Sequence, residues 1–302
     1  MSMFRSTLLA ASRSQRLRNG LEKFGPTRSV VQRFVGGPDI EHVVQVVRSL
    51  SARNLLSTVD HLGEDVTDDR GADATLSAYL ALLESLRGVN SADVSVKLTA
   101  LGLKHSPDGA LQRARTIVNA ASSMGATVTI DMESSSLTDA TLATVRELRR
   151  DEPSVAAVLQ AMLRRTESDA RALGAEGARV RLCKGAYAED RSVAFHHRED
   201  VRSSYVRSLT LLWESAGTPL VATHDPVLID AARQLALNKE RTFEFQMLYG
   251  VRPDEQTRLV QLGHRVRIYV PYGDEWYGYL VRRLAERPAN VKFFLRSISS
   301  KS

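Results

Sequence analysis

The chain has 302 residues, of which 43% are hydrophobic and 25% charged, a composition typical of a globular protein and not of a disordered or fibrous one. Its 41 Lys and Arg against 35 Asp and Glu give a net charge of +6, which permits an anionic ligand, an acidic membrane surface or nucleic acid without requiring any of them. The single cysteine, Cys183, excludes an internal disulfide and a multi-cysteine metal site, and we expect it to be a small buried residue.

The N-terminal segment is rich in Ser and Arg and has no acidic residue before Glu22. This composition is typical of a transit peptide, but also of a basic amphipathic helix that lies on the protein or on anionic lipid. Because no cleavage signal is evident, we expect residues 1–50 to form a retained helical extension, with a break at GGPD (36–39). No window approaches eighteen apolar residues, so a membrane-spanning helix is not expected.

Eight short stretches rich in β-branched or apolar residues follow, and longer stretches of helical pattern lie between them. The predicted strands span 54–60, 94–101, 127–133, 155–162, 179–185, 219–225, 241–248 and 264–270. This alternation predicts an α/β protein with a (β/α)₈ TIM-type barrel over 51–290, preceded by the N-terminal helices and followed by a tail at 291–302. A doubly wound open sheet is the alternative, disfavoured because no Gly-rich dinucleotide loop follows the first strand.

Polar residues occupy the end of nearly every predicted strand, where Val, Ile or Leu would be usual. They are Asp60, Glu64, Lys97, Asp131, Gln160, Arg181, Lys184, Thr223, His224, Gln246 and Tyr269. Each of them alone could merely cap a strand or pair with a neighbour. Because barrel active sites lie at the C-terminal ends of the strands, we expect the set to converge on one mouth.

The stretch YGYLVRRLAE (277–286) predicts an amphipathic helix near the end of the chain. Tyr279, Arg282, Arg283 and Glu286 recur at helical spacing and share one face, opposite a stripe of apolar residues. This face is either a solvated surface with an Arg282–Glu286 pair or a socket in which two guanidinium groups bind a carboxylate or phosphate. Spacing alone does not choose between the two.

Several of these stretches, taken together and in order, resemble the proline dehydrogenase family from about residue 54 to 290. The matching segments are STVDHLGE, VSVKLTAL, TIDME, RLCKGAY, ATHD, FEFQMLYG, RIYVPYG and YGYLVRRLAE. The resemblance implies a distorted (β/α)₈ barrel with FAD at the C-terminal ends of the strands. It also implies oxidation of L-proline to Δ1-pyrroline-5-carboxylate by hydride transfer to flavin N5, with electrons passed to a membrane quinone. A separate pyrroline-5-carboxylate dehydrogenase would then act on the product in proline catabolism.

The resemblance also implies roles for individual residues. The proline carboxylate would be clamped by Lys97, Arg282 and Arg283, and the ring would be walled by Leu248, Tyr269 and Tyr279. Glu64 would pair with Arg282 as a lid, with Glu286 as a further support. The catalytic residues would be Asp131, Arg181 and Tyr269, where a tyrosine at 269 is similar to members that prefer proline to hydroxyproline. The cofactor would be bound by Met132, Gln160, Lys184, Gly185, Ala186, Tyr187, Thr223, His224 and Gln246. Ala188 and Asp225 depart from residues found in some members.

Other functions remain open at this point. A methylenetetrahydrofolate reductase-like flavin barrel shares the architecture, and a non-flavin barrel could be an aldolase with Lys97 or Lys184 as Schiff base or a phosphate-ligand binding module. A nucleic-acid module is disfavoured because the basic residues are not interleaved with aromatic ones. No metal site is predicted, since His196 and His197 alone stand together, in a run expected to be exposed. We expect a cytoplasmic location with optional peripheral contact to the inner face of the plasma membrane, or a mitochondrial one if the N-terminus is a transit peptide.

Overall fold

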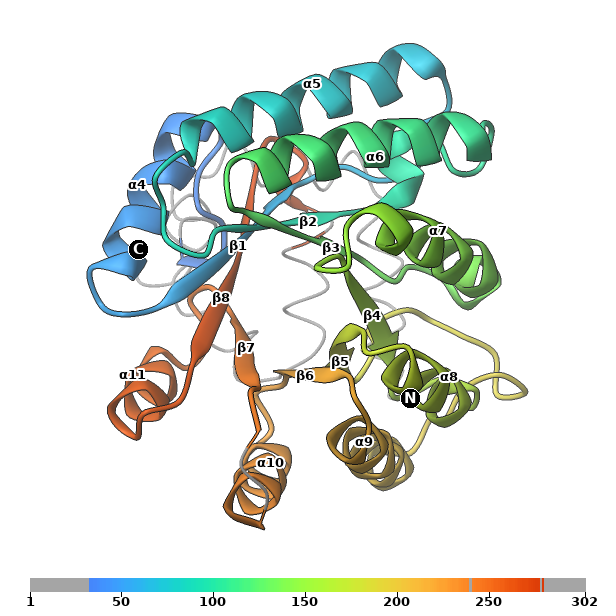
Figure 1. Cartoon of the computed structure of the whole chain (residues 1–302), viewed down its shortest axis with the longest axis vertical. Helices are drawn as coiled ribbons and strands as arrows, with labels where there is room; N and C mark the ends of the chain where they lie inside the picture. Colours follow the sequence, from blue (N-terminus) through green and yellow to red (C-terminus); the bar gives the residue numbers. More distant parts are fainter. Residues whose placement is uncertain (1–32, 239–240, 278, 280–302) are drawn as a thin grey trace, which may run out of the picture.

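The computed structural model describes residues 33–238, 241–277 and 279, in which eight parallel strands form a closed barrel in sequence order (Figure 1). The strands are β1 (Leu56–His61), β2 (Asp93–Val96), β3 (Thr127–Ile130), β4 (Ala156–Gln160), β5 (Arg179–Cys183), β6 (Thr218–Ala222), β7 (Glu244–Leu248) and β8 (Val266–Tyr272). The barrel closes where β8 pairs with β1, with Leu56 opposite Arg267 and Thr58 opposite Tyr269. The predicted (β/α)₈ barrel is confirmed.

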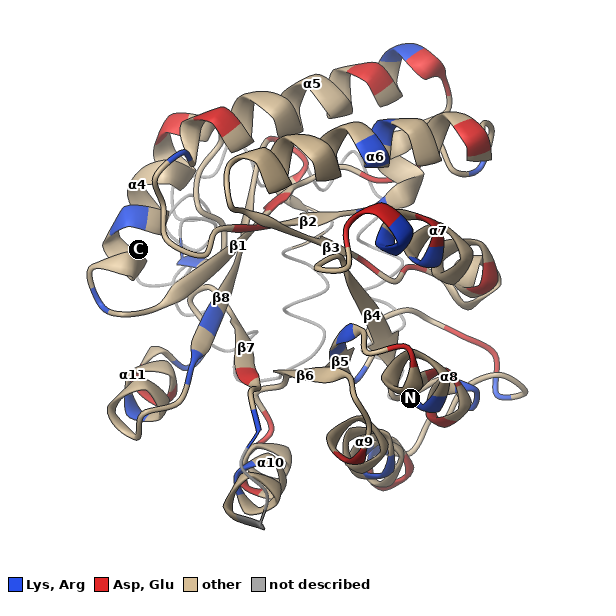
Figure 2. Ribbon diagram, in the orientation of Figure 1, with Lys and Arg blue, Asp and Glu red and all other residues tan. Residues whose placement is uncertain are grey.

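Helices surround the strands as an outer ring (Figure 1). They are α4 (Ile40–Ser51), α5 (Asp69–Ser85), α6 (Pro107–Ser123), α7 (Thr138–Asp151), α8 (Thr166–Ala175), α9 (Arg198–Glu214), α10 (Pro226–Asn238) and α11 (Pro253–Gln261), with short 3₁₀ turns η1 (Leu98–Leu101) and η2 (Ser135–Leu137). Helix α4 illustrates why they pack there, because Val43, Val47 and Leu50 recur at helical spacing and are all buried. Figure 2 shows acidic and basic positions interspersed along the outer helices.

The GGPD segment at 36–39, predicted as a break, immediately precedes helix α4. The Asp39 side chain accepts a hydrogen bond from the His42 backbone N–H at 3.0 Å and so caps the helix. The preceding segment lies against β8, since the Gly36 N–H donates to the Pro271 carbonyl at 2.7 Å. A Cβ at Gly36 would lie 2.6 Å from the Val270 side chain, so this close approach requires glycine. No helix in the described part of the chain is long and apolar enough to cross a membrane.

Most of the predicted strands are longer than the observed ones, and the two that end before Lys97 and Asp131 affect the site. The stretch predicted as a strand over 94–101 leaves β2 after Val96 and enters η1. The Glu133 carboxylate accepts hydrogen bonds from the Thr99 backbone N–H and hydroxyl, which stabilises this turn. Strand β3 likewise ends at Ile130, so Asp131 lies in the loop at the mouth of the barrel.

Candidate active site

A cavity of about 700 Å³ opens at the C-terminal ends of the strands. Every strand contributes to its lining, either from its last residues or from the loop that follows. This arrangement is the usual location of a barrel active site, because side chains from many strands converge there on loops that a rigid barrel positions.

Most of the predicted site residues line this one cavity. They are Lys97, Asp131, Met132, Gln160, Arg181, Lys184, Gly185, Ala186, Tyr187, Thr223, His224, Gln246, Leu248, Tyr269 and Tyr279. Glu64 is exposed on the loop after β1 and is not among the lining residues. Arg282, Arg283 and Glu286 lie outside the described residues.

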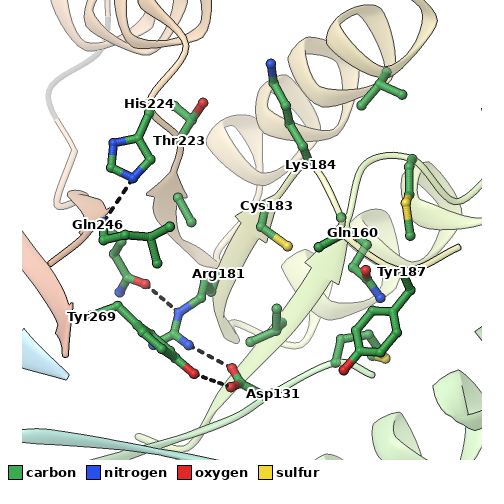
Figure 3. Close-up of a pocket in the computed structure, with 18 of the residues that line it drawn as sticks. Asp131, Gln160, Arg181, Cys183, Lys184, Tyr187, Thr223, His224, Gln246 and Tyr269 are labelled. Atoms are coloured by element: carbon green, nitrogen blue, oxygen red, sulfur yellow. Dashed lines mark hydrogen bonds and ion pairs between the residues drawn. The ribbon is translucent and has the colours of Figure 1, made fainter. Parts of the chain in front are cut away.

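The inner end of the cavity is a hydrogen-bonded cluster centred on Asp131 (Figure 3). Tyr269 donates its hydroxyl to Asp131 Oδ2 at 2.9 Å, and Arg181 Nη1 donates to Oδ1 at 2.9 Å. The Ser95 hydroxyl also donates to Oδ1, at 2.8 Å. Burial and the nearby Asp131 carboxylate raise the pKa of Tyr269 well above its ordinary value, so its hydroxyl stays protonated and acts as a donor.

A second ion pair adjoins this cluster. Lys97 Nζ lies 2.7 and 2.8 Å from the two carboxylate oxygens of Asp60 and 3.9 Å from Asp131. Burial disfavours the ammonium ion, but the carboxylates of Asp60 and Asp131 raise the pKa of Lys97 above its ordinary value. Lys97 is therefore a cation at neutral pH, although only 8% of its surface is exposed.

Arg181 is held from several directions by groups beneath the cavity. Its Nε donates to Gln246 Oε1 at 2.5 Å and its Nη1 to the Ser95 hydroxyl at 2.8 Å, while Nη2 lies 3.6 Å from Asp93. Sequence reasoning missed Ser95 and Asp93. A signal was present, because Asp93, Ser95 and Lys97 alternate along DVSVK and so point to one face of the strand.

At another side of the cavity three cations surround one carboxylate. Asp225 accepts from Lys184 at 2.5 Å and from Arg202 at 2.8 and 3.0 Å, and Arg198 lies 3.7 Å away. Figure 3 shows Lys184 and Thr223 across the cavity from Asp131 and Tyr269. Because Lys184 and Arg198 both line the cavity, this side carries a positive excess suited to phosphate groups. Asp225 therefore serves as the shared counter-ion of these cations.

The polar groups between these two regions have defined donor and acceptor directions. The Leu248 backbone N–H donates to His224 Nε2 at 3.0 Å, so the ring proton lies on Nδ1. Gln160 Nε2 donates to the Glu133 carbonyl at 2.7 Å, which leaves its Oε1 as an acceptor. Gly185 has φ of +97°, and a Cβ there would lie 2.6 Å from Met162, so the turn after β5 requires glycine. A planar, polar heteroaromatic ring joined to phosphates fits such a lining.

Beyond the predicted residues 184–187, the later part of the loop between β5 and α9 also lines the cavity and was not predicted to do so. Glu189, Phe195 and His196 belong to it, and the Glu189 carboxylate accepts from the Ser135 backbone N–H at 2.7 Å. The expectation that His196 is exposed is wrong, because His196 is half-buried with Nε2 2.9 Å from the Glu189 carbonyl. Cys183 was expected to be buried, yet it is only partly so and lines the cavity. Across the described residues, no group of His, Cys, Asp and Glu is placed to hold a metal ion.

Comparison with known proteins gives a consistent result. The family model described as proline dehydrogenase matches residues 43–296. The chain is similar to proline dehydrogenase 1 of Bacillus subtilis (strain 168), with 36% identity over 304 residues that cover 99% of this chain and 100% of the relative. It is also similar to proline dehydrogenase of Deinococcus radiodurans, with 33% identity over 89% of this chain and 90% of the relative.

Solved structures show the same fold. The crystal structure of proline utilization A (PutA) from Bdellovibrio bacteriovorus, inactivated by N-propargylglycine, matches with a TM-score of 0.82 and 25% identity. That match covers 99% of this chain but only 38% of the solved chain. PutA from Corynebacterium freiburgense matches in fold, with a TM-score of 0.76 and 20% identity.

Proposed function

The chain belongs to the proline dehydrogenase family, and from this premise we propose that it oxidises L-proline to Δ1-pyrroline-5-carboxylate with a bound FAD. The observation that carries the proposal is the hydrogen-bonded cluster of Asp131, Arg181 and Tyr269 beside the buried Lys97–Asp60 pair, at the inner end of a cavity with a cationic side. A bound FAD would supply the acceptor for the hydride that leaves the ring carbon next to the proline nitrogen, and a membrane quinone would take up the electrons.

The lining supports binding of FAD by residues with separate tasks. Lys184 and Arg198 offer cationic donors to the pyrophosphate, and both lie against the carboxylate of Asp225. Gln160 and His224 offer one acceptor and one N–H donor of fixed direction to a flavin edge. Met132, Ala186, Tyr187 and Thr223 line the same space and are assigned to the cofactor with Gly185 and Gln246.

Charge balance shows what a carboxylate substrate still requires. At the inner end, the cations Lys97 and Arg181 face three carboxylates among the described residues, those of Asp60, Asp131 and Asp93. An incoming proline carboxylate would therefore add a further unmatched negative charge to a buried site, which is costly. We assign the missing positive charge to Arg282 and Arg283, with Lys97 as a further donor to the carboxylate.

Asp131 is an anchor in this proposal and does not serve as the base. Its two oxygens accept hydrogen bonds from Ser95, Arg181 and Tyr269, so its task is to hold the arginine and the tyrosine in place. Tyr269, Tyr279 and Leu248 wall the proline ring in this assignment, and the ring nitrogen must be neutral for its lone pair to assist hydride loss. Positioning of the reacting carbon supplies most of the rate enhancement.

Anaerobic titration with L-proline tests the function. The purified protein should be yellow, its flavin absorbance should bleach with proline, and an added quinone should restore it. Bleaching by a reduced nicotinamide and not by proline would favour a folate-reducing flavin barrel, and a colourless protein that ignores added FAD would favour a non-flavin barrel.

The variant Arg283→Met tests the carboxylate clamp. A hydrogen bond to a charged group contributes about 1.5–3 kcal/mol, so the proline concentration for half-bleaching should rise about 10- to 100-fold while FAD stays bound. Arg258→Met is the matched control, because Arg258 pairs with Glu255 on the surface of α11. Unchanged proline binding in Arg283→Met would contradict the clamp.

We further propose that reduction of the quinone takes place at the inner face of the plasma membrane, with the basic N-terminal segment as the contact. Binding to anionic vesicles that weakens with salt would support this location. Loss of vesicle binding on removal of residues 1–25 would assign the contact, and retention would refute that assignment.

A further inference from the structure

We infer that Glu244 is a positioning residue that sets the amide orientation of Gln246 and, through it, the guanidinium group of Arg181. Glu244 does not line the cavity, and it lies at the opposite, N-terminal end of β7. The relevance of Arg181 to catalysis rests on the proposed function. The hydrogen bonds that link Glu244, Gln246 and Arg181 do not depend on it.

The inference starts from an unbroken chain of hydrogen bonds through the interior of the barrel. Arg267 Nε donates to Glu244 Oε1 at 2.7 Å, and Gln246 Nε2 donates to the same oxygen at 2.7 Å. Gln246 Oε1 then accepts from Arg181 Nε at 2.5 Å, and Arg181 reaches Asp131 at 2.9 Å. Figure 3 shows the last two links, in which Arg181 lies between Gln246 and Asp131.

A carboxylate at position 244 leaves the Gln246 amide only one favourable orientation. An ionised carboxylate only accepts hydrogen bonds, and an arginine Nε only donates one. In the observed orientation the Gln246 NH₂ group faces Glu244 and its carbonyl oxygen faces Arg181. A flipped amide would set two acceptors against each other at one end and two donors at the other, within a site where unmatched polar groups are costly.

Glu244 is itself held firmly. Only 3% of its surface and 3% of that of Arg267 are exposed, and Arg267 also donates to the Ser57 and Ser91 carbonyls at 2.8 and 2.9 Å. Burial opposes ionisation of Glu244, but the Arg267 guanidinium keeps its pKa below the ordinary value. The carboxylate is therefore ionised at neutral pH and remains an acceptor.

Gln246 accepts the hydrogen bond from Arg181 Nε, which neither Asp131 nor Ser95 contacts. Those two residues accept from Nη1, and Nη2 lies 3.6 Å from Asp93 without a hydrogen bond among the described residues. If the Gln246 oxygen turned away from Nε, the planar guanidinium would be free to rotate about its contact with Asp131. Such a rotation would move a cation of the proposed flavin site.

Three variants separate positioning from simple stability. Glu244→Gln presents an amide that can donate, so it removes the constraint on Gln246. Arg267→Gln breaks the Arg267–Glu244 ion pair but keeps the Glu244 carboxylate, whose ionised form the Gln246 amide and the nearby Arg179 and Arg265 side chains still favour. The double variant removes both charges, so no buried ion is left unpaired if Glu244→Gln alone fails to fold. Leu148→Ala on α7 is the control for lost stability alone, because Leu148 is buried and takes no part in these hydrogen bonds.

Two measurements decide the outcome. The first is hydrogen exchange of the Arg181 Nε–H in flavin-free protein, whose signal is assigned by its absence in Arg181→Lys. This exchange should be faster in Glu244→Gln and in the double variant, and it should be unchanged in Arg267→Gln and in Leu148→Ala. The second is kcat of flavin-loaded protein. It should fall by about 100-fold in Glu244→Gln and in the double variant, as for a reacting group misplaced by about 1 Å, with little change in the KM for proline. Arg267→Gln and Leu148→Ala should lower Tm but leave kcat nearly unchanged.

Wild-type exchange and kcat in a folded double variant would overturn the inference, as would an equal loss of kcat in Arg267→Gln. If the wild-type protein does not bind FAD or respond to proline, the proposed function fails. The exchange measurement on flavin-free protein then still decides whether Glu244 positions Arg181.

Discussion

Lys97 Nζ bonds both carboxylate oxygens of Asp60, at 2.7 and 2.8 Å, in a pair that exposes 8% and 1% of its members' surfaces. The lysine assigned to the substrate carboxylate is thus already paired in the protein. Asp60 keeps a buried cation ionised and directs it toward the cavity, and it also offsets the charge of that cation before substrate arrives.

Asp60→Asn should therefore destabilise the fold strongly. Removal of one partner leaves a buried, uncompensated charge, and we expect a loss of about 3 kcal/mol in the free energy of unfolding. Urea denaturation measures this loss. Glu84→Gln is the matched control, because Glu84 pairs with Arg87 on the exposed surface of α5, and it should produce no measurable change. Equal stability of Asp60→Asn and the wild type would show that the pair is not effectively buried.

Tyr269→Phe should lower kcat/KM without unfolding the protein. It removes the hydroxyl that donates to Asp131 at 2.9 Å, and a loss of about 1.4 kcal/mol corresponds to about 10-fold. Tyr272→Phe is the matched control on the same strand, because the Tyr272 hydroxyl is buried with no hydrogen-bond partner among the described residues. Similar losses in the two variants would indicate a general effect of β8 and not of the Asp131 contact.

Stability toward acid should depend on Asp225. Burial opposes its ionisation, but hydrogen bonds from Arg202 and Lys184 lower its pKa in the folded protein. A carboxyl group with a lowered folded pKa stabilises the fold above its unfolded value of 3.8 and loses that contribution as the pH falls through the folded pKa. The Tm of thermal unfolding, measured from pH 7 to pH 3, should therefore fall less steeply at the acid end in Asp225→Asn than in the wild type. Parallel curves would contradict this role.

Gly185→Ala should weaken FAD binding more than it weakens the fold. A residue other than glycine with positive φ costs about 1–2 kcal/mol, and the added Cβ would also displace Met162, which lines the cavity. Gly88→Ala is the matched control, because Gly88 has φ of +81° but no atom within 4 Å of the new Cβ. Both variants should lose the stability that positive φ costs a non-glycine residue, Gly185→Ala should lose somewhat more because Met162 must move, and only Gly185→Ala should release flavin more readily. Unchanged flavin affinity would exclude close approach of the cofactor at this turn.

Periodicity and strand-end polarity were enough to predict the barrel and most of the cavity lining. Alternation places every second residue of a strand on the same face, so Arg181 and Gln246 were recognised as inward residues before any contact was known. Strand ends were less predictable. The turn after Val96 depends on the Glu133 carboxylate, which lies 34 residues from Thr99 in the chain and leaves no local signal.

Hydrophobic period and turn composition are local properties of the chain, so they were sufficient to predict the architecture and most of the polar residues of the site. The pairing of those polar residues depends on the folded barrel. Lys97 meets Asp60 across 37 residues, and Arg181 meets Gln246 across 65. Closure of the barrel brings these strands together, and burial makes an unpaired charge costly, so each charged side chain pairs with a group from another strand.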